Sequence, residues 1–207
     1  MKKLLLVAEL ILLFLILPLL YYFDWIPGHK SVPLLLAFAY CLIILLLDKS
    51  FDRRQLRARH FRGFGSIMKR FGFTAILLTA YLFIFEPENF LMIPKTNLWP
   101  WVAIMVFYPL WSALPQELIF RAFYFHRYRL IIPNLNVLMI LNALLFAYMH
   151  IIFNNWIALL GGFIAGLFWA QTYLRTKSLL TVSAEHAIYG NFIYTFGLGP
   201  YFYVPDF

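Results

Sequence analysis

The chain contains several apolar runs about as long as a membrane is thick, and these runs limit its possible folds more than any other feature. The first extends from about Leu4 to Phe23 and includes one carboxylate, Glu9. A helix needs about 20 mainly apolar residues to cross the hydrocarbon core of a bilayer. Of the 207 residues, 63% are hydrophobic, which is more than a soluble domain of this length can bury. The sequence predicts an all-α, multipass transmembrane helical bundle of about seven spans.

The connections between the predicted spans are short, so we expect residues 1–207 to form a single integral membrane domain. The N-terminus, with Lys2 and Lys3 before an apolar run, resembles a signal peptide, but the run has no small-x-small cleavage site. We therefore interpret it as a retained first span. Spans are expected at about residues 4–23, 32–47, 71–85, 97 into 115–129, 135–152, 156–174 and 179–196.

The basic residues predict how the bundle is oriented. Lys and Arg gather in the cytoplasmic loops of membrane proteins. With a cytoplasmic N-terminus and seven spans, all 17 Lys and Arg residues except Lys30 and Lys95 fall on the cytoplasmic side. The basic segment 48–70 is then a cytoplasmic loop that touches anionic lipid headgroups, so the net charge of +8 needs no nucleic-acid partner. We expect a protein of the cell membrane whose partner is the lipid bilayer, with no nucleic acid bound.

Polar residues recur within the last four spans, where they are costly and are usually kept for function or to neutralise one another. Glu117 and Arg121 are four residues apart, which places them on one face of a helix. If the fourth and fifth spans form a hairpin that turns near Ile132-Pro133, Glu117 and His150 lie at similar depth. The third cluster is in the last span and starts nearer its membrane edge. The three clusters are Gln116, Glu117 and Arg121; His150; and Glu185, His186 and Asn191.

These groups include the parts needed to hydrolyse a peptide bond with water. A carboxylate and an imidazole can deprotonate a water molecule, and a second imidazole with an amide can stabilise an oxyanion. Other readings stay open: the histidines can form helix–helix hydrogen bonds or hold a haem, and Glu117 and Arg121 can simply neutralise each other. Glu117, His150 and His186 can also supply three zinc ligands. No two of them have the i, i+4 spacing of many zinc sites, so we expect no metal and no other cofactor.

Glycines in the sixth predicted span have a structural reading. Gly162 and Gly166 form a small-xxx-small pair, which more often indicates close helix packing than a ligand site.

The order of the motifs resembles the CAAX protease and bacteriocin-processing family, which includes the type II CAAX prenyl endopeptidases. The resemblance covers residues 97–196 and rests on Gln116-Glu117-x-x-x-Arg121, Phe146-x-x-x-His150, and His186 followed by Asn191. It implies a glutamate-dependent membrane endopeptidase that acts on a membrane-associated peptide or protein. By the same resemblance, Glu117 and His150 activate water, His186 and Asn191 hold the oxyanion, and Arg121 orients the acidic side chain. The alternative function is a non-catalytic membrane scaffold or immunity-type protein that keeps the fold.

The chain departs from the family pattern at two positions. The family motif begins with two adjacent Glu residues, but the first position here is Gln116, which cannot take a proton. The third motif places Asn four residues after His, where this chain has Gly190, and Asn191 follows at five. We expect Glu117 to be the essential carboxylate, because the neighbouring Glu185 projects about 100° away from His186 on a helix.

Overall fold

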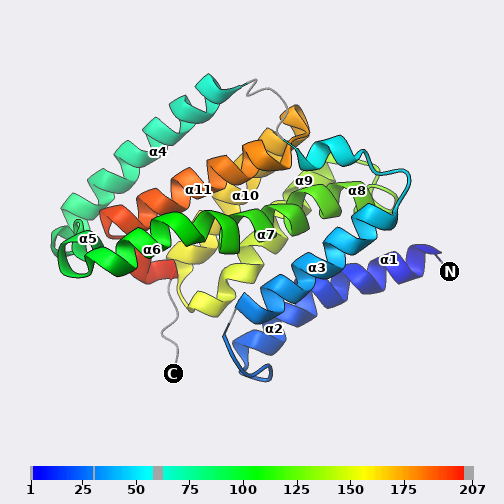
Figure 1. The fold of residues 1–207 in the computed structure, drawn as a ribbon, viewed down its shortest axis with the longest axis horizontal. Helices are drawn as coiled ribbons and strands as arrows, with labels where there is room; N and C mark the ends of the chain where they lie inside the picture. The colour runs from blue at the N-terminus through cyan, green and yellow to red at the C-terminus, as the bar shows by residue number, and fades with distance from the viewer. Residues whose placement is uncertain (1, 30, 58–62, 203–207) are drawn as a thin grey trace.

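The computed structural model describes residues 2–29, 31–57 and 63–202, and every regular element within them is a helix (Figure 1). This confirms the predicted all-α fold. Five helical stretches are long and apolar enough to cross a membrane: Lys3–Tyr22, Phe64–Phe85, Leu98–Tyr128, Leu135–Phe153 and Trp156–Thr176. The apolar helix α3 (Ser31–Leu47) is shorter, and the last long helix is α11 (Leu179–Phe196). The chain is a multipass membrane protein.

Several of the long stretches contain short segments of different helical geometry. The first combines α1 (Lys2–Ile11), a π-helical segment (Leu12–Ile16) and α2 (Leu17–Tyr22). Two others are simple helices, α4 (Phe64–Phe85) and α10 (Trp156–Thr176). The helix α9 (Leu135–Met149) continues as a 3-10 turn (His150–Phe153). Short elements fill the connections: 3-10 turns at Arg53–Leu56, Pro87–Asn89 and Gly199–Phe202, and α5 (Met92–Thr96).

The ends of the last three helices are set by local side chains. Asn134, Asn155 and Ser178 each accept hydrogen bonds from backbone N–H groups in the first turn that follows, which satisfies donors that have no partner inside the helix. At the other end of α11, Gly197 adopts φ 117°, a left-handed conformation that favours glycine. The starts of the fifth, sixth and seventh spans therefore lie where the sequence predicted them.

The third span begins earlier than predicted. We expected it at residue 71, but α4 begins at Phe64, so Lys69 and Arg70 lie inside the helix rather than in the basic loop. Arg70 points toward the bundle and is ion-paired with Glu185 of α11. Of the expected loop charges, Arg59 and Arg62 lie outside the described residues. Arg70 can lie inside the helix because the buried carboxylate of Glu185, on α11, is a partner for its charge.

The central element of the bundle is a continuous helical stretch from Leu98 to Tyr128. It consists of α6 (Leu98–Tyr108), α7 (Leu114–Glu117) and α8 (Tyr124–Tyr128), joined by π-helical segments at Pro109–Ala113 and Leu118–Phe123. Proline lacks the N–H that an α-helix needs, and a π-helical turn accommodates the missing bond without ending the helix. The prediction that residues 115–129 continue the fourth span is confirmed.

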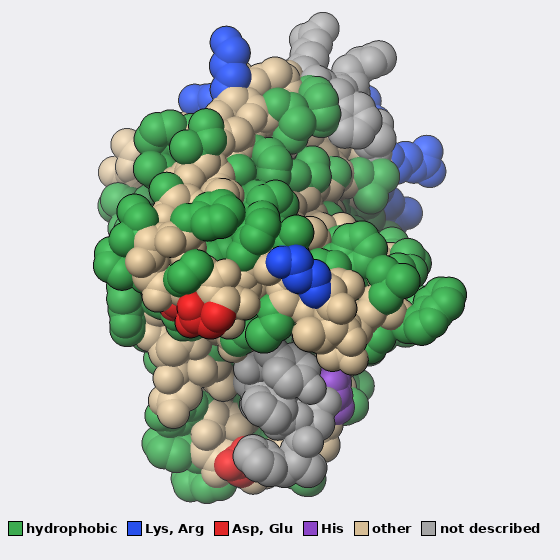
Figure 2. Space-filling view, turned by 90° about the vertical axis from the view of Figure 1, so that its left-hand side faces the viewer, with side chains coloured by type: hydrophobic (Ala, Val, Ile, Leu, Met, Phe, Trp, Pro, Cys, Tyr) green, Lys and Arg blue, Asp and Glu red, His purple; other side chains and the backbone are tan. Residues whose placement is uncertain are grey.

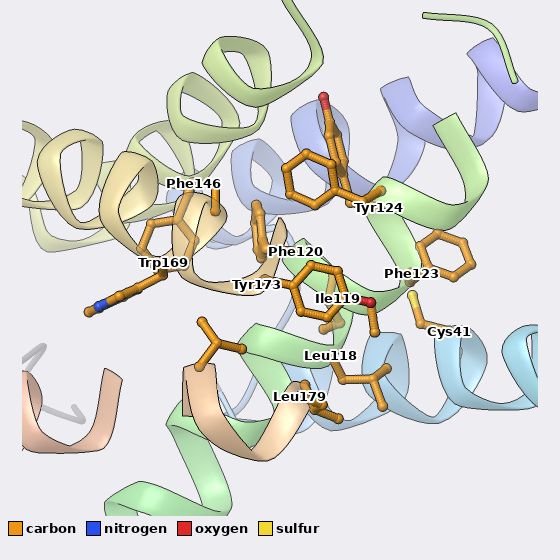
Figure 3. Packing of buried hydrophobic residues seen from close by; sticks show 14 of the residues in the cluster. Cys41, Leu118, Ile119, Phe120, Phe123, Tyr124, Phe146, Trp169, Tyr173 and Leu179 are labelled. Atoms are coloured by element: carbon orange, nitrogen blue, oxygen red, sulfur yellow. The ribbon is translucent and has the colours of Figure 1, made fainter. Parts of the chain in front are cut away.

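The buried core surrounds the middle of this stretch (Figure 3). Leu118, Phe120 and Phe123 are nearly inaccessible to solvent and pack against residues of the other helices. Phe120 packs edge-on against Phe146 of α9, with ring centroids 5.0 Å apart. Aromatic pairs of this kind hold the Leu98–Tyr128 stretch against its neighbours and fix the position of Glu117 in the bundle interior.

Close packing of α9 and α10 depends on glycine. A Cβ atom on Gly166 would lie 2.9 Å from the Cα of Ala143, and one on Gly162 would lie 3.1 Å from Nδ1 of His150. A side chain on Gly166 would therefore push against the α9 backbone, as expected for a small-xxx-small packing face. The pair has the predicted packing role, and Gly162 also makes room for a candidate site residue.

Candidate active site

A large cavity lies in the bundle between its two ends. Its volume is about 870 Å³, and most of its wall is apolar. Its wall is formed by residues from many helices, including α2, α3, α4, α6, α10 and α11. The polar side chains in the wall include Tyr108, Gln116, His150 and His186. Each of the three predicted polar clusters thus contributes one residue to the wall of this cavity: Gln116, His150 and His186.

Glu117 lies behind the wall of this cavity and is fully buried. Arg121, one turn further on, is also fully buried, and its Nε atom is 3.0 Å from Oε2 of Glu117. The guanidinium lies over the Phe146 ring, 4.9 Å from its centroid, and donates from Nη1 to Oδ1 of Asn142. The positive charge therefore has a carboxylate, an amide and an aromatic face around it, which compensates for its removal from water.

The second oxygen of Glu117 contacts α11. Oε1 lies 2.8 Å from Nδ1 of His186, which is almost completely buried. Because an ionised carboxylate can only accept, Nδ1 carries the proton, and the lone pair of a neutral imidazole is then on Nε2. The His186 ring stacks on Trp169, with centroids 3.8 Å apart. Carboxylate and indole together fix both the tautomer and the orientation of this ring.

His150 is held in the same tautomer by a different partner. Its Nδ1 atom lies 2.7 Å from the carbonyl oxygen of Phe146, which accepts, so Nδ1 donates and Nε2 has the lone pair. The rings of His150 and His186 both pack on Phe146, at 4.9 Å and 6.0 Å between centroids. The cavity wall thus contains two imidazoles that both pack on Phe146, each with a proton acceptor at Nε2.

The structure pairs Glu117 with His186, not with His150. We expected His186 to start nearer the membrane edge and His150 to share the depth of Glu117. The contact forms because α11 packs directly against the Leu98–Tyr128 stretch, and sequence depth alone does not show which helices are neighbours. Both oxygens of Glu117 face protein groups, so the carboxylate reaches the cavity only through His186.

Gln116 lies in the cavity wall beside Ser112. Its Nε2 atom donates to the Ser112 hydroxyl at 2.8 Å, and among the described residues its buried Oε1 atom has no hydrogen-bond partner. The amide therefore presents an acceptor where the family resemblance predicts a carboxylate.

Asn191 does not occupy the predicted position. Its Nδ2 atom donates to the carbonyl oxygen of Met105 at 3.3 Å, and the residue is not among those that line the cavity within the described chain. Because Asn191 follows His186 by five residues, the helix turns its side chain away from the face that His186 occupies. Its predicted partnership with His186 is not seen.

Three residues near the site were not among the site residues predicted from the sequence. Asn142 lies inside the apolar run of the fifth span, where it accepts from Arg121 and donates to the Phe120 carbonyl at 2.7 Å. Trp169 stacks on His186, and Tyr108 packs edge-on against it with centroids 5.9 Å apart. An amide inside an apolar run signals a buried partner, but the aromatic contacts have no sequence signal of their own in a chain with 23 Phe and 13 Tyr residues.

The donor set does not fit a metal centre. Among the described residues, no group of three or more His, Cys, Asp and Glu side chains is arranged to hold a metal ion. Glu117 is engaged by Arg121 and His186, so its carboxylate is not free to act as a third ligand beside the two histidines.

Comparison with known proteins identifies one region of the chain. Residues 97–193 match the family model "Type II CAAX prenyl endopeptidase Rce1-like". The match spans the Leu98–Tyr128 stretch, α9, α10 and most of α11, and so contains Glu117, Arg121, His150 and His186. It confirms the resemblance drawn from the motifs. No curated protein and no solved structure matches the chain significantly.

Proposed function

Because residues 97–193 belong to the type II CAAX prenyl endopeptidase Rce1-like family, we propose that the protein is a membrane-embedded endopeptidase. It hydrolyses a peptide bond of a membrane-associated peptide or protein substrate. The observation that carries the proposal is the contact between Glu117 and His186, in which a buried carboxylate fixes an imidazole that faces the cavity.

In this mechanism the Nε2 atom of His186 is the general base. It takes a proton from a water molecule while the water oxygen attacks the carbonyl carbon of the scissile bond. The carbonyl electron pair moves to its oxygen and forms a tetrahedral oxyanion. The C–N bond then breaks, His186 returns the proton to the leaving nitrogen, and the products are a carboxylic acid and an amine.

Glu117 supports this step through charge and orientation. When His186 takes the proton it becomes an imidazolium, and the carboxylate 2.8 Å from Nδ1 stabilises that positive charge. Arg121 holds the other carboxylate oxygen in place. The pair is pre-arranged in a water-poor interior, where such interactions are stronger than in water. His150, whose Nε2 is also a proton acceptor and whose ring packs on the same Phe146, assists as a second acceptor in the cavity wall.

The surroundings of the site favour a substrate from the membrane. The cavity wall is mainly apolar and includes α2, α3 and α4, whose outer faces expose large hydrophobic side chains. An apolar substrate can therefore remain in a hydrophobic environment as it enters. The chemistry favours a peptide segment attached to, or lying beside, the bilayer.

A cleavage assay tests the proposal. The full-length protein is reconstituted in liposomes with a panel of internally quenched peptides, one farnesylated at a C-terminal CAAX sequence and others with transmembrane or unlipidated sequences. We expect cleavage of a membrane-associated peptide by the wild type and loss of cleavage in Glu117→Gln and His186→Gln. Equal cleavage in Glu117→Gln contradicts the mechanism, and no cleavage of any peptide by the wild type contradicts the enzymatic function.

One observation favours a second candidate, a non-catalytic membrane scaffold that keeps the fold. The cavity wall has the amide of Gln116 where the family resemblance predicts a carboxylate, and Glu117 does not itself line the cavity. A scaffold needs the buried Glu117–Arg121 pair only for folding. In that case Glu117→Gln lowers thermal stability, and the wild type shows no peptide turnover in the liposome assay.

A further inference from the structure

The side chain of Tyr108 occupies space that a side chain at position 190 would otherwise fill. A Cβ atom built on Gly190 would lie 2.1 Å from Cε1, 2.3 Å from Cζ and 2.4 Å from the hydroxyl oxygen of Tyr108. Contacts this short are incompatible with any side chain at 190 unless the ring moves. The absence of a Cβ on Gly190 is therefore what lets the phenol of α6 lie against the α11 backbone.

Gly190 lies next to the proposed base on the surface of α11. Gly190 follows His186 by four residues, so both lie on the same face of α11, one turn apart. That face borders the cavity, since His186, Gly190 and Tyr108 all line it. The Tyr108 ring also meets the His186 ring edge-on, at 72° and 5.9 Å between centroids. The phenol of Tyr108 thus lies one helical turn along α11 from the proposed base, in the wall of the same cavity.

The Tyr108 hydroxyl is available to a ligand. Among the residues that the structure describes, this hydroxyl makes no hydrogen bond, and the side chain is partly exposed. That exposure is toward the cavity, because Tyr108 is one of the lining residues. A phenol O–H is a donor to any oxygen that approaches it.

Several other polar side chains near His186 already have hydrogen-bond partners, and the unpartnered Nε1 of Trp169, whose ring stacks on His186, is buried. Asn191 donates to the Met105 carbonyl, the Tyr194 hydroxyl donates to the Phe202 carbonyl at 3.1 Å, and Gln116 donates to Ser112. His150 uses its Nδ1 proton on Phe146 and offers only a lone pair at Nε2. A developing oxyanion needs a donor aimed at it from the wall of the site.

We propose that Tyr108 is a catalytic residue that donates a hydrogen bond from its hydroxyl to the oxyanion of the tetrahedral intermediate. The inference rests on the proposed peptidase function and names the group that stabilises its transition state. The amide expected on α11 is replaced here by a phenol from α6, which reaches the same place across the gap left by Gly190. The hydroxyl keeps its own proton throughout, so no additional proton transfer is needed.

The first test removes only the oxygen. In Tyr108→Phe the ring still fills the space over Gly190, so the fold is preserved. With the peptide that the wild type cleaves in liposomes, we expect kcat to fall by about 100-fold or more, while KM stays within about 3-fold, because the donor acts in the transition state. Tyr173→Phe is the matched control: Tyr173 is buried outside the cavity and donates to Gln55 at 2.8 Å. It is expected to keep the wild-type kcat.

The second test moves the donor from one helix to the other. Gly190→Asn alone places its side chain into the Tyr108 ring and is expected to lose activity. Combined with Tyr108→Ala, it has room for an amide at the position the phenol hydroxyl leaves. We expect the double variant to cleave faster than Tyr108→Ala alone. Thermal unfolding of each purified variant separates loss of the donor from loss of the fold.

The outcomes separate this inference from the function on which it rests. If Glu117→Gln is inactive but a stably folded Tyr108→Phe keeps kcat within about 3-fold of the wild type, the oxyanion role is overturned and the peptidase function stands. An equal fall in Tyr108→Phe and Tyr173→Phe also overturns it, since both then act through packing. If the wild type cleaves no peptide in the panel, the peptidase function and this inference fail together.

Discussion

The carboxylate of Glu185 is ion-paired with the guanidinium of Arg70, although the two residues are 115 positions apart in the chain. Glu185 is 1% exposed, and Arg70 also donates to the Thr172 hydroxyl at 2.7 Å and lies over the Phe168 ring. The pair joins α4 to α10 and α11 directly beside His186. Few residues of α4 are buried in the bundle.

Breaking this pair on one side should destabilise the protein. Arg70→Gln leaves the Glu185 charge buried without its partner, at a cost of roughly 3–5 kcal/mol. Glu185→Gln is expected to cost less, because the Arg70 guanidinium keeps partial access to solvent. Unfolding of the two single variants and the double variant in detergent measures the coupling. Costs that simply add up across the double-mutant cycle contradict a direct pair.

Adding one methyl group to Gly166 should loosen the packing of α9 on α10. The new Cβ would lie 2.9 Å from the Cα of Ala143, a backbone atom that can move only with its helix. We expect Gly166→Ala to destabilise the protein by about 1–3 kcal/mol, the usual cost of overpacking. Gly161→Ala is the control, because its Cβ would lie 3.6 Å from the Phe202 ring, an ordinary contact. Equal unfolding temperatures for the two variants would contradict the assignment.

Replacing Gln116 by Glu should be tolerated. The Ser112 hydroxyl next to it accepts from the amide now and can donate to a carboxylate instead, since a hydroxyl does both. We expect Gln116→Glu to cleave the liposome substrate at least as fast as the wild type. Gln116→Leu, of similar size, removes the acceptor at Oε1 and should be slower. A Glu variant less active than the Leu variant rules out an acceptor role for this position.

Stability should fall at acidic pH through Glu86, at the start of the loop after α4. Burial alone would raise the pKa of Glu86, but hydrogen bonds from Tyr201, Asn89 and Tyr81 outweigh it and lower the pKa below its usual 4.5. The folded-state pKa is therefore depressed, so this contribution is complete above about pH 5 and is lost as the pH falls through the folded pKa. The hydrogen bond from the Tyr201 hydroxyl to Glu86 holds the C-terminal turn (Gly199–Phe202) against the end of α4.

The measurement is the unfolding temperature between pH 7 and pH 3. The wild type should lose more stability over this interval than Glu86→Gln, which has no carboxylate to protonate at this position. Parallel curves for the two proteins would mean that Glu86 does not contribute to the pH dependence.

The N-terminus is proposed to be cytoplasmic. Figure 2 views the α5 end of the molecule, which is mainly hydrophobic and shows few basic side chains near its centre. Lys95 is at this end, in α5, whereas Arg53, Arg54 and Arg57 lie at the opposite end of α3 and α4. Reporter fusions after Ser50 should report the cytoplasm and those after Pro27 the outside. The reverse pattern would invert the orientation of the whole bundle.

The sequence by itself determined the elements of this protein. Its apolar runs predict seven long helices, because a helix is the structure that satisfies every backbone group of a single segment in lipid. The motifs around Glu117, His150 and His186 indicated the family, which the match to residues 97–193 confirms.

Only the tertiary structure decided which of these groups meet. Almost every helix here is apolar on all sides, so periodicity does not show which face points toward which neighbour. Three contacts follow from how α4, α6, α7 and α11 pack: the pairing of Glu117 with His186, the ion pair of Arg70 with Glu185, and the packing of Tyr108 over Gly190. These contacts depend on how each helix is rotated about its axis and on which helices are neighbours. Both are decided only when the bundle forms, because the residues concerned are far apart in the sequence.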